Sequence, residues 1–178
     1  LKTGSSERSF LFNMSVGYDL EGIKTEKMNR FIESMKDGST DERFSGYLSV
    51  LENEIAGGLL SGTGFEHRSP ALRGISGRIS SAICKAVTLS TMHGCPPEEI
   101  ESICTYLISE KGLDTYVKLN PTLLGYNTVR DILDTLGYGY IRLTKKTFEH
   151  DLQYEDAVSI LERLKKHAAK ENRLFGIK

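Results

Sequence analysis

The sequence has few of the features that mark disulfide-stabilised, membrane or nucleic-acid-binding proteins. Only three of its 178 residues are cysteine, and Cys84, Cys95 and Cys104 form no CxxC pair. We therefore expect neither a disulfide scaffold nor a four-cysteine iron–sulfur site in this stretch. No apolar run is long enough to cross a bilayer. The net charge of −1 gives no electrostatic case for binding nucleic acid or an anionic membrane.

The remaining composition is that of an ordinary globular protein, with 39% hydrophobic and 26% charged residues. This is enough for one sizeable core or for part of a larger one. The polar start at residues 1–6 lacks a methionine and a signal-peptide core. We expect a single domain over residues 1–178, cut from a longer multidomain protein of the reducing cytoplasm. No histidine pair stands at ligand spacing on an expected helix, so we expect no metal site.

Apolar runs and helical periodicity alternate along the chain, most regularly after Ala86. This alternation is typical of parallel βαβ units. A closed (β/α)₈ barrel has eight strands and about 250 residues. The sequence therefore predicts an α/β fold, a partial TIM-type barrel with about five strands. The strands are expected at Ser9–Met14, Ala86–Ser90, Thr115–Leu119, Tyr140–Leu143 and Arg173–Ile177.

Helix signals fill the intervals between these strands. Asp41 is placed to cap a helix that carries Phe44 to Ile55, and Pro97 lies in the first turn of the next one. Asn127 or Thr128 is placed to cap a helix that ends at Gly137. The apolar stripes are expected to be buried; they comprise Ile100, Ile103, Cys104, Leu107 and Ile108 in one helix and Val129, Ile132, Leu133 and Leu136 in the other.

Two polar loops follow the carboxyl ends of expected strands, at 91–96 and 120–125. In an α/β barrel these loops converge at the edge where the chemistry takes place. We therefore expect the two loops to lie side by side. Lys118 stands within an apolar strand, where an ammonium group is costly to bury without an anionic or electron-rich partner. A structural ion pair with a neighbouring carboxylate is the alternative.

Three other residues at this edge each allow two interpretations. His93 titrates near neutral pH and can donate a proton to a substrate, or it can simply bond to the loop backbone. Cys95 precedes a helix, a position that lowers a thiol pKa, although such a cysteine often has no redox role. Thr88 shares a face with Ser90 and can line a polar pocket, or it can serve as a good strand former.

Three segments carry a resemblance to a known family. VTLSTMHGCPPEEIE at 87–101, YVKLNPTLLGY at 116–126 and FLFNMSVGYDLEGI at 10–23 resemble the putative selenate reductase large-subunit family. That family is described as a multidomain flavin and iron–sulfur oxidoreductase. Residues 88–121 are also similar to the FMN barrel of dihydropyrimidine and dihydroorotate dehydrogenases.

The resemblance implies roles for individual residues. Lys118 matches a lysine that touches the flavin, and Thr88 stands where the dehydrogenases have an asparagine at the cofactor site. Asn13, at the end of the first expected strand, and Asn120 correspond to substrate contacts. Each asparagine also has a purely structural interpretation, because an asparagine side chain often forms hydrogen bonds with the backbone of a turn.

The catalytic cysteine of those dehydrogenases is replaced by Thr91. The resemblance therefore leaves proton donation to Thr91, His93 or Cys95. The intact protein is expected to pass electrons through FMN to a small oxidised substrate, a heterocycle or a selenate-like oxyanion. Iron–sulfur clusters and partner domains or subunits would lie elsewhere in the full-length protein. A non-catalytic barrel scaffold is the alternative, and a flavin-free lyase with a Schiff base on Lys118 is a weaker one.

The loops that hold the FMN phosphate in such barrels follow the last strands. We therefore expect the isolated 178-residue chain to be inactive, to bind no flavin and to self-associate through its open barrel edge.

Overall fold

The computed structural model describes residues 12–90 and 94–178. The chain divides into two compact units. The barrel unit comprises the described residues up to Met28 together with Lys85–Lys178, and the inserted unit is Asn29–Cys84. Among the described residues, no helix combines the length and the apolar character that a membrane span requires.

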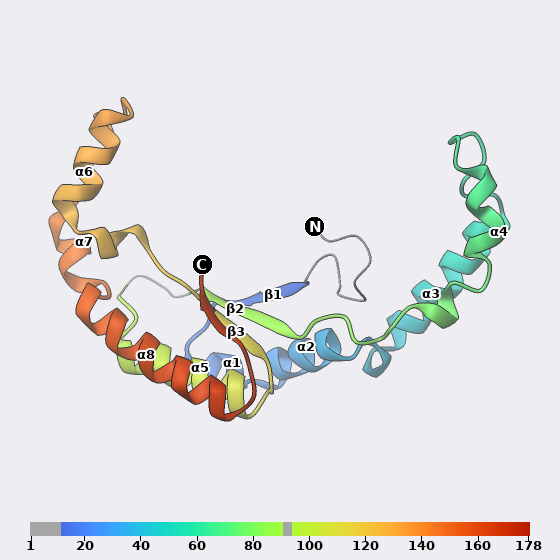
Figure 1. Cartoon of the computed structure of the whole chain (residues 1–178), viewed down its shortest axis with the longest axis horizontal. Coiled ribbons are helices and arrows are strands. Elements are labelled where there is room, and N and C mark those ends of the chain that lie inside the picture. The colour runs from blue at the N-terminus through green and yellow to red at the C-terminus, as the bar shows by residue number, and fades with distance from the viewer. Residues whose placement is uncertain (1–11, 91–93) are drawn as a thin grey trace. The chain divides into compact units, whose positions relative to one another are not determined.

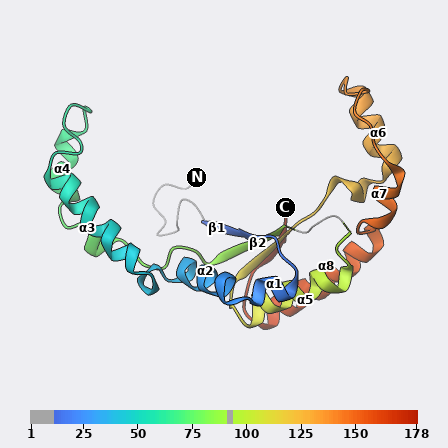
Figure 2. The same ribbon diagram turned by 180° about the vertical axis from the view of Figure 1, so that it is seen from behind.

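The barrel unit is built on one sheet of four parallel strands, in the order β1-β2-β3-β4 (Figure 1). Helices α1, α5 and α8 lie on the same side of this sheet (Figures 1 and 2). Parallel strands in sequential order, with the helices of the same unit on one face, are the arrangement of a TIM-type barrel, so the predicted fold class is confirmed. The elements are β1 (Asn13–Val16), α1 (Leu20–Lys24), β2 (Ala86–Ser90), α5 (Pro97–Ser109), β3 (Asp114–Lys118), α8 (Tyr154–Lys170) and β4 (Phe175–Ile177).

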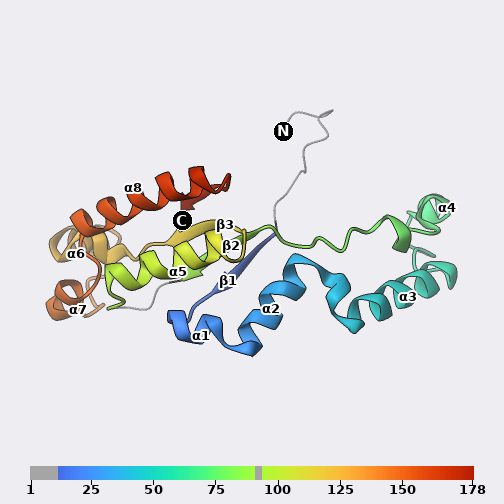
Figure 3. The same cartoon turned by 90° about the horizontal axis from the view of Figure 1, so that it is seen from below.

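The core lies between the sheet and these helices. The predicted stripe of α5 is confirmed, because all five of its residues are buried. α5 and α8 run side by side (Figure 3). Arg163 of α8 joins them at the surface through two hydrogen bonds to the Glu101 carboxylate, of 2.7 and 2.6 Å. These hydrogen bonds lower the pKa of Glu101, so this link weakens in acid as that carboxylate is protonated.

The opposite face of the sheet, here called the open face, carries most of the polar strand residues. The register places Ser15, Thr88, Tyr116 and Gly176 on one level of this face. One level further toward the carboxyl ends lie Ser90 and Lys118, which are paired in the register. Because side chains alternate between the two faces of a strand, this is the interior face of the barrel.

Gly176 allows the Tyr116 ring to lie across β4. A Cβ atom at position 176 would stand 2.7 and 2.8 Å from two carbons of that ring. We predict that Gly176→Ala lowers the local opening free energy of β3 and β4 by about 1–3 kcal/mol, because the ring must move. Hydrogen exchange of these strand amides in the full-length protein measures the effect. In a Tyr116→Ala background the same glycine substitution should cost much less, and an equal cost would contradict the ring contact.

The segment that connects β3 to α8 contains additional helical elements at the carboxyl edge. It consists of η4 (Pro121–Leu124), α6 (Tyr126–Thr135) and α7 (Lys145–His150). The prediction of a strand at Tyr140–Leu143 was wrong, since this segment forms a loop. The Arg130 guanidinium accounts for it by donating hydrogen bonds to the carbonyl oxygens of Tyr138 (3.1 Å) and Ile141 (2.6 Å). The described residues therefore form four strands rather than five.

The apolar stripe predicted for α6 exists but is not buried, so that prediction was also wrong. No residue of α6 is buried, and Leu136 is 63% exposed. The helix begins at Tyr126 after Gly125, whose φ of 79° favours glycine, rather than at the predicted caps Asn127 or Thr128. Periodicity identifies the apolar face of a helix but not whether another element covers it. Self-association through such apolar surface stays a prediction.

The inserted unit is helical. It contains most of α2 (Glu26–Lys36), then α3 (Glu42–Ala56) and the single turn α4 (Ser69–Leu72). The predicted cap is confirmed, since the Asp41 side chain accepts a hydrogen bond from the Arg43 backbone N–H. Hydrogen bonds from Arg43 also lower the pKa of Asp41 to about 2. The Glu52 carboxylate of α3 accepts hydrogen bonds from the backbone N–H groups of Gly74 and Ser76, which follow α4.

Candidate active site at the carboxyl edge of the sheet

Asp151 joins the loops at the carboxyl edge of the barrel unit through hydrogen bonds to its carboxylate. Its Oδ1 accepts hydrogen bonds from the backbone N–H of Gly94 (3.3 Å) and of Leu152 (3.0 Å). Its Oδ2 accepts from Asn120 Nδ2 (3.3 Å) and Thr122 Oγ1 (2.6 Å). The loops that follow β2 and β3 thus meet on one carboxylate. Their predicted juxtaposition is confirmed for the described residues.

Sequence reasoning missed Asp151. It lies between α7 and α8 and is 7% exposed, which is unusual for a carboxylate. In the sequence it resembles an ordinary cap residue before a helix, and no local pattern links it to Gly94 in the loop after β2 or to Thr122 in the loop after β3. Its bond to Asn120 Nδ2 has a chemical consequence. The amide nitrogen is engaged, so the Asn120 carbonyl oxygen is the group available to accept from a ligand.

Lys118 is the last residue of β3 and lies exposed on the open face, level with Ser90. Gly17, just after β1, adjoins Ser90, because a Cβ at position 17 would stand 3.5 Å from the Ser90 carbonyl oxygen. This is ordinary contact, so packing does not require glycine there. A glycine at a strand end often marks a place where a ligand approaches the backbone. At the carboxyl end of the open face the Lys118 ammonium group therefore has Ser90 and Gly17, two residues of little bulk, near it.

Thr88 and Asn13 lie together on the open face. Thr88 Oγ1 donates to Asn13 Oδ1 at 2.9 Å, and Thr88 is 4% exposed. Asn13, however, is the first residue of β1, whereas the sequence had predicted it near the end of a strand over Ser9–Met14. Residues 9–11 of that predicted strand lie outside the described residues. It pairs with Ala86, four residues before the partner of Lys118, which corresponds to about 13 Å along the strands. Asn13 and Lys118 therefore do not reach the same end of the sheet.

Cys95 lies on the helix side of the sheet. It lines a pocket of about 480 Å³ together with two core residues, Leu89 of β2 and Ile103 of α5. Burial raises the pKa of the Cys95 thiol, and the carboxylates of Glu99 and Asp151 raise it further. The prediction that the helix N-terminus lowers this pKa was wrong. Nearby negative charges and desolvation outweigh the partial charge of the helix end.

We predict that Cys95 reacts slowly with iodoacetamide at pH 8, and that its rate rises only at a higher pH than for free cysteine. The raised pKa keeps the thiol protonated at neutral pH. Glu99→Gln keeps an acceptor for the Leu20 backbone N–H, which Glu99 Oε1 binds at 2.8 Å, and removes one negative charge. This variant should react several-fold faster. Peptide-resolved mass spectrometry of the full-length protein measures the rate. An unchanged rate in Glu99→Gln would contradict the electrostatic explanation.

Cys104 is the internal reference for this experiment. It is buried, and burial raises its pKa to about 12, so it should remain unlabelled in the same samples. Thr91 and His93, the other two residues considered as proton donors, lie outside the described residues. No group of three or more histidine, cysteine, aspartate or glutamate side chains in the described part of the chain could hold a metal ion.

A parallel sheet with its helices on one face and its polar loops joined at the carboxyl edge is the active-site architecture of TIM-type barrels. The family model for the N-terminal TIM-barrel domain of oxidoreductase YgfK matches residues 1–178, and the chain belongs to this family. Two relatives named "Putative oxidoreductase YgfK", from Escherichia coli K12 and O157:H7, are each 48% identical over 174 residues. The match covers 97% of this chain but 17% of each relative. No solved structure matches the chain significantly.

Proposed function

We propose that the intact protein is a flavin-dependent oxidoreductase whose barrel holds FMN against the carboxyl end of the open face. The observation that carries this proposal is the position of Lys118. It ends a parallel strand on the interior face, beside Ser90 and the side-chain-free Gly17. These residues suit a flat ring that gains negative charge on reduction, because Lys118 offers a positive charge while Ser90 and Gly17 add little bulk. Bound FMN would supply the electron transfer that amino-acid side chains cannot perform.

The residues of this chain would bind and orient. The Lys118 ammonium group would stabilise negative charge on the ring system. Thr88 would support the cofactor site from one level below, bonded to Asn13. Asn13 itself would meet only a substrate that extends deep into the barrel. Asn120, held by Asp151, would accept a hydrogen bond from substrate through its carbonyl oxygen.

Proton delivery would fall to the loop that follows β2. Cys95 keeps its proton because its pKa is raised, but it faces the helix layer with Leu89. We therefore favour His93 or Thr91 over Cys95. The donor would act on a small oxidised substrate, either a heterocycle or a selenate-like oxyanion. Iron–sulfur clusters, electron-transfer partners and a cytoplasmic location belong to the same proposal for the full-length protein.

The cofactor content of the full-length protein tests this proposal. Purified protein should show flavin absorbance, and the released cofactor should be FMN by chromatography. A colourless protein that does not take up added FMN would instead favour the scaffold alternative, to which the replacement of the dehydrogenase cysteine by Thr91 also points. Covalent trapping of a carbonyl substrate on Lys118 by borohydride would favour the lyase.

A further inference from the structure

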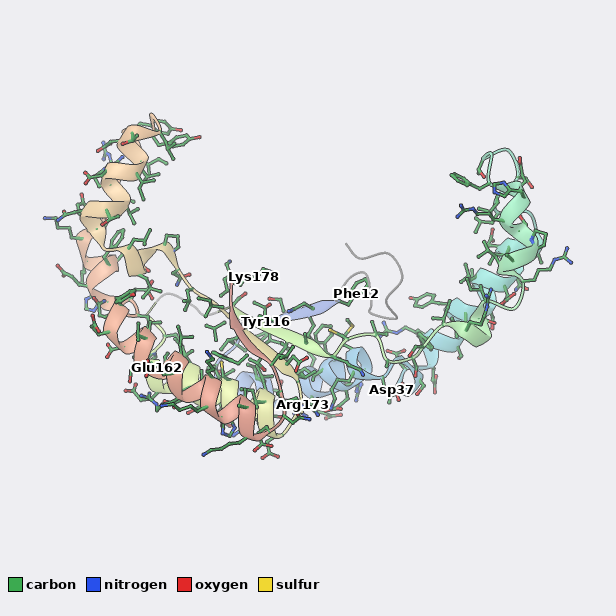
Figure 4. The ribbon with its side chains drawn as sticks, viewed as in Figure 1. Phe12, Asp37, Tyr116, Glu162, Arg173 and Lys178 are labelled. Carbon is green, nitrogen blue, oxygen red and sulfur yellow. The ribbon has the colours of Figure 1, made fainter. Side chains whose placement is uncertain are left out.

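A second lysine lies beside Lys118. The Lys178 backbone N–H donates to the Val117 carbonyl at 2.9 Å, and the Leu119 N–H donates to the Lys178 carbonyl at 3.1 Å. These two bonds continue the register of β3 and β4 and place Lys178 directly opposite Lys118. Figure 4 shows Lys178 at the end of β4. Sequence analysis missed it because the last strand was expected to end at Ile177.

Both lysines lie on the open face. Tyr116 precedes Lys118 by two residues and Gly176 precedes Lys178 by two, and these two residues are paired on the same face. Neighbouring strands are about 4.8 Å apart, so the two side chains start close together. Both are exposed. An anion that contacts both ammonium groups is attracted by each of them.

The other residues at this level leave room for such an anion. Gly17 has no side chain, and Ser90 offers a hydroxyl group that lies 3.3 Å from the Ser15 hydroxyl. Carboxylates and tetrahedral oxyanions carry two or more oxygen atoms, so a single ion can accept from both lysines at once. A neutral heterocycle gains much less from a second positive charge.

We propose that Lys118 and Lys178 form a two-lysine site that binds a small oxyanion, with carboxylates included. As a statement about the substrate, this rests on the proposed function. Of the two substrate classes named there, it favours the oxyanion over the neutral heterocycle. As a statement about binding, it requires only the sheet register. Lys178 thereby becomes the residue that gives the site its preference for anions.

The experiment measures acylation of individual lysines in the full-length protein by mass spectrometry. Sulfate is the probe, ionic strength is held constant with chloride, and uracil serves as the neutral comparison. Sulfate should slow acylation of Lys118 and Lys178 together, with one half-saturation concentration, and uracil should not. Lys165, which is exposed on α8, is the control for general ionic effects and should be unaffected.

Single substitutions complete the test. In Lys178→Met the sulfate concentration that protects Lys118 should rise at least about tenfold, which is the effect of losing one charge-assisted contact. Lys178→Arg should retain protection of Lys118. The proposal is overturned if sulfate protects neither lysine, protects only one, or slows Lys165 equally. It is also overturned if uracil protects as well as sulfate does.

The outcome is separable from that of the flavin proposal. Protection of both lysines in a protein that neither carries nor takes up FMN would leave the anion site standing and remove the flavin barrel. Normal FMN content without sulfate protection would do the reverse.

Discussion

Lys118→Met in the full-length protein should lower the reduction potential of the flavin by tens of millivolts. Methionine keeps much of the side-chain volume and removes the positive charge that we place against the ring. Loss of one charge-assisted hydrogen bond to the reduced form is worth about 1–3 kcal/mol. For a two-electron couple this corresponds to roughly 20–65 mV. Redox titration of the two proteins measures the shift.

Two controls make this result specific. Lys118→Arg keeps the charge and should shift the potential less than Lys118→Met does. The planar guanidinium group of arginine does not place the charge as the lysine ammonium group does, so a small shift is still expected. Lys165→Met removes an exposed charge on α8 and should leave the potential unchanged. FMN content should fall less than the potential, because phosphate contacts dominate flavin binding. Normal occupancy with an unchanged potential in Lys118→Met would remove this residue from the cofactor site.

Asp151→Ala should open the carboxyl edge of the barrel unit. The substitution removes the acceptor of four hydrogen bonds, including those from the Gly94 backbone N–H and the Thr122 hydroxyl. A buried donor left without an acceptor costs about 1–3 kcal/mol, and the partly exposed donors here cost less because water can reach them. We expect the local opening free energy at Gly94 and Leu152 to fall by about 2–4 kcal/mol. Hydrogen exchange of these amides in the full-length protein measures it.

A second variant of Asp151 and a control at Asp156 test whether the effect comes from the hydrogen bonds that Asp151 accepts. Asp151→Asn keeps one acceptor oxygen and should cost less than alanine. Asp156→Ala, at an exposed position in the first turn of α8, should leave exchange at Gly94 unchanged. Opening confined to Leu152, with Gly94 and the loop after β3 unaffected, would show that Asp151 does not join the two loops.

The parts of the fold that local patterns determine were predictable. β2 was predicted with its exact bounds, and β3 was predicted to within one residue at each end. The stripe of α5 was identified because a helix with core on one side repeats its apolar residues at a fixed period. These elements fix the position of Lys118, so the central site residue could be placed from the sequence alone.

The remaining features depend on contacts between distant residues. The apolar run at Tyr140–Leu143 has a strand pattern, but Arg130 binds the backbone around it and keeps it in a loop. Burial raises the Cys95 pKa, and the carboxylates of Glu99 and of Asp151, which lies far along the chain, raise it further, so the local argument from the helix end gave the wrong direction. The importance of Lys178 depends on register, which periodicity does not determine.

Protection of Lys118 by flavin tests the central claim most directly. The full-length protein is compared with and without its FMN, and the acylation rate of each lysine is measured by mass spectrometry. If Lys118 lies against the ring, bound FMN should slow its acylation by at least about tenfold and leave Lys165 unchanged. Equal rates at Lys118 in the two states, or a full-length protein that binds no FMN, would contradict the account.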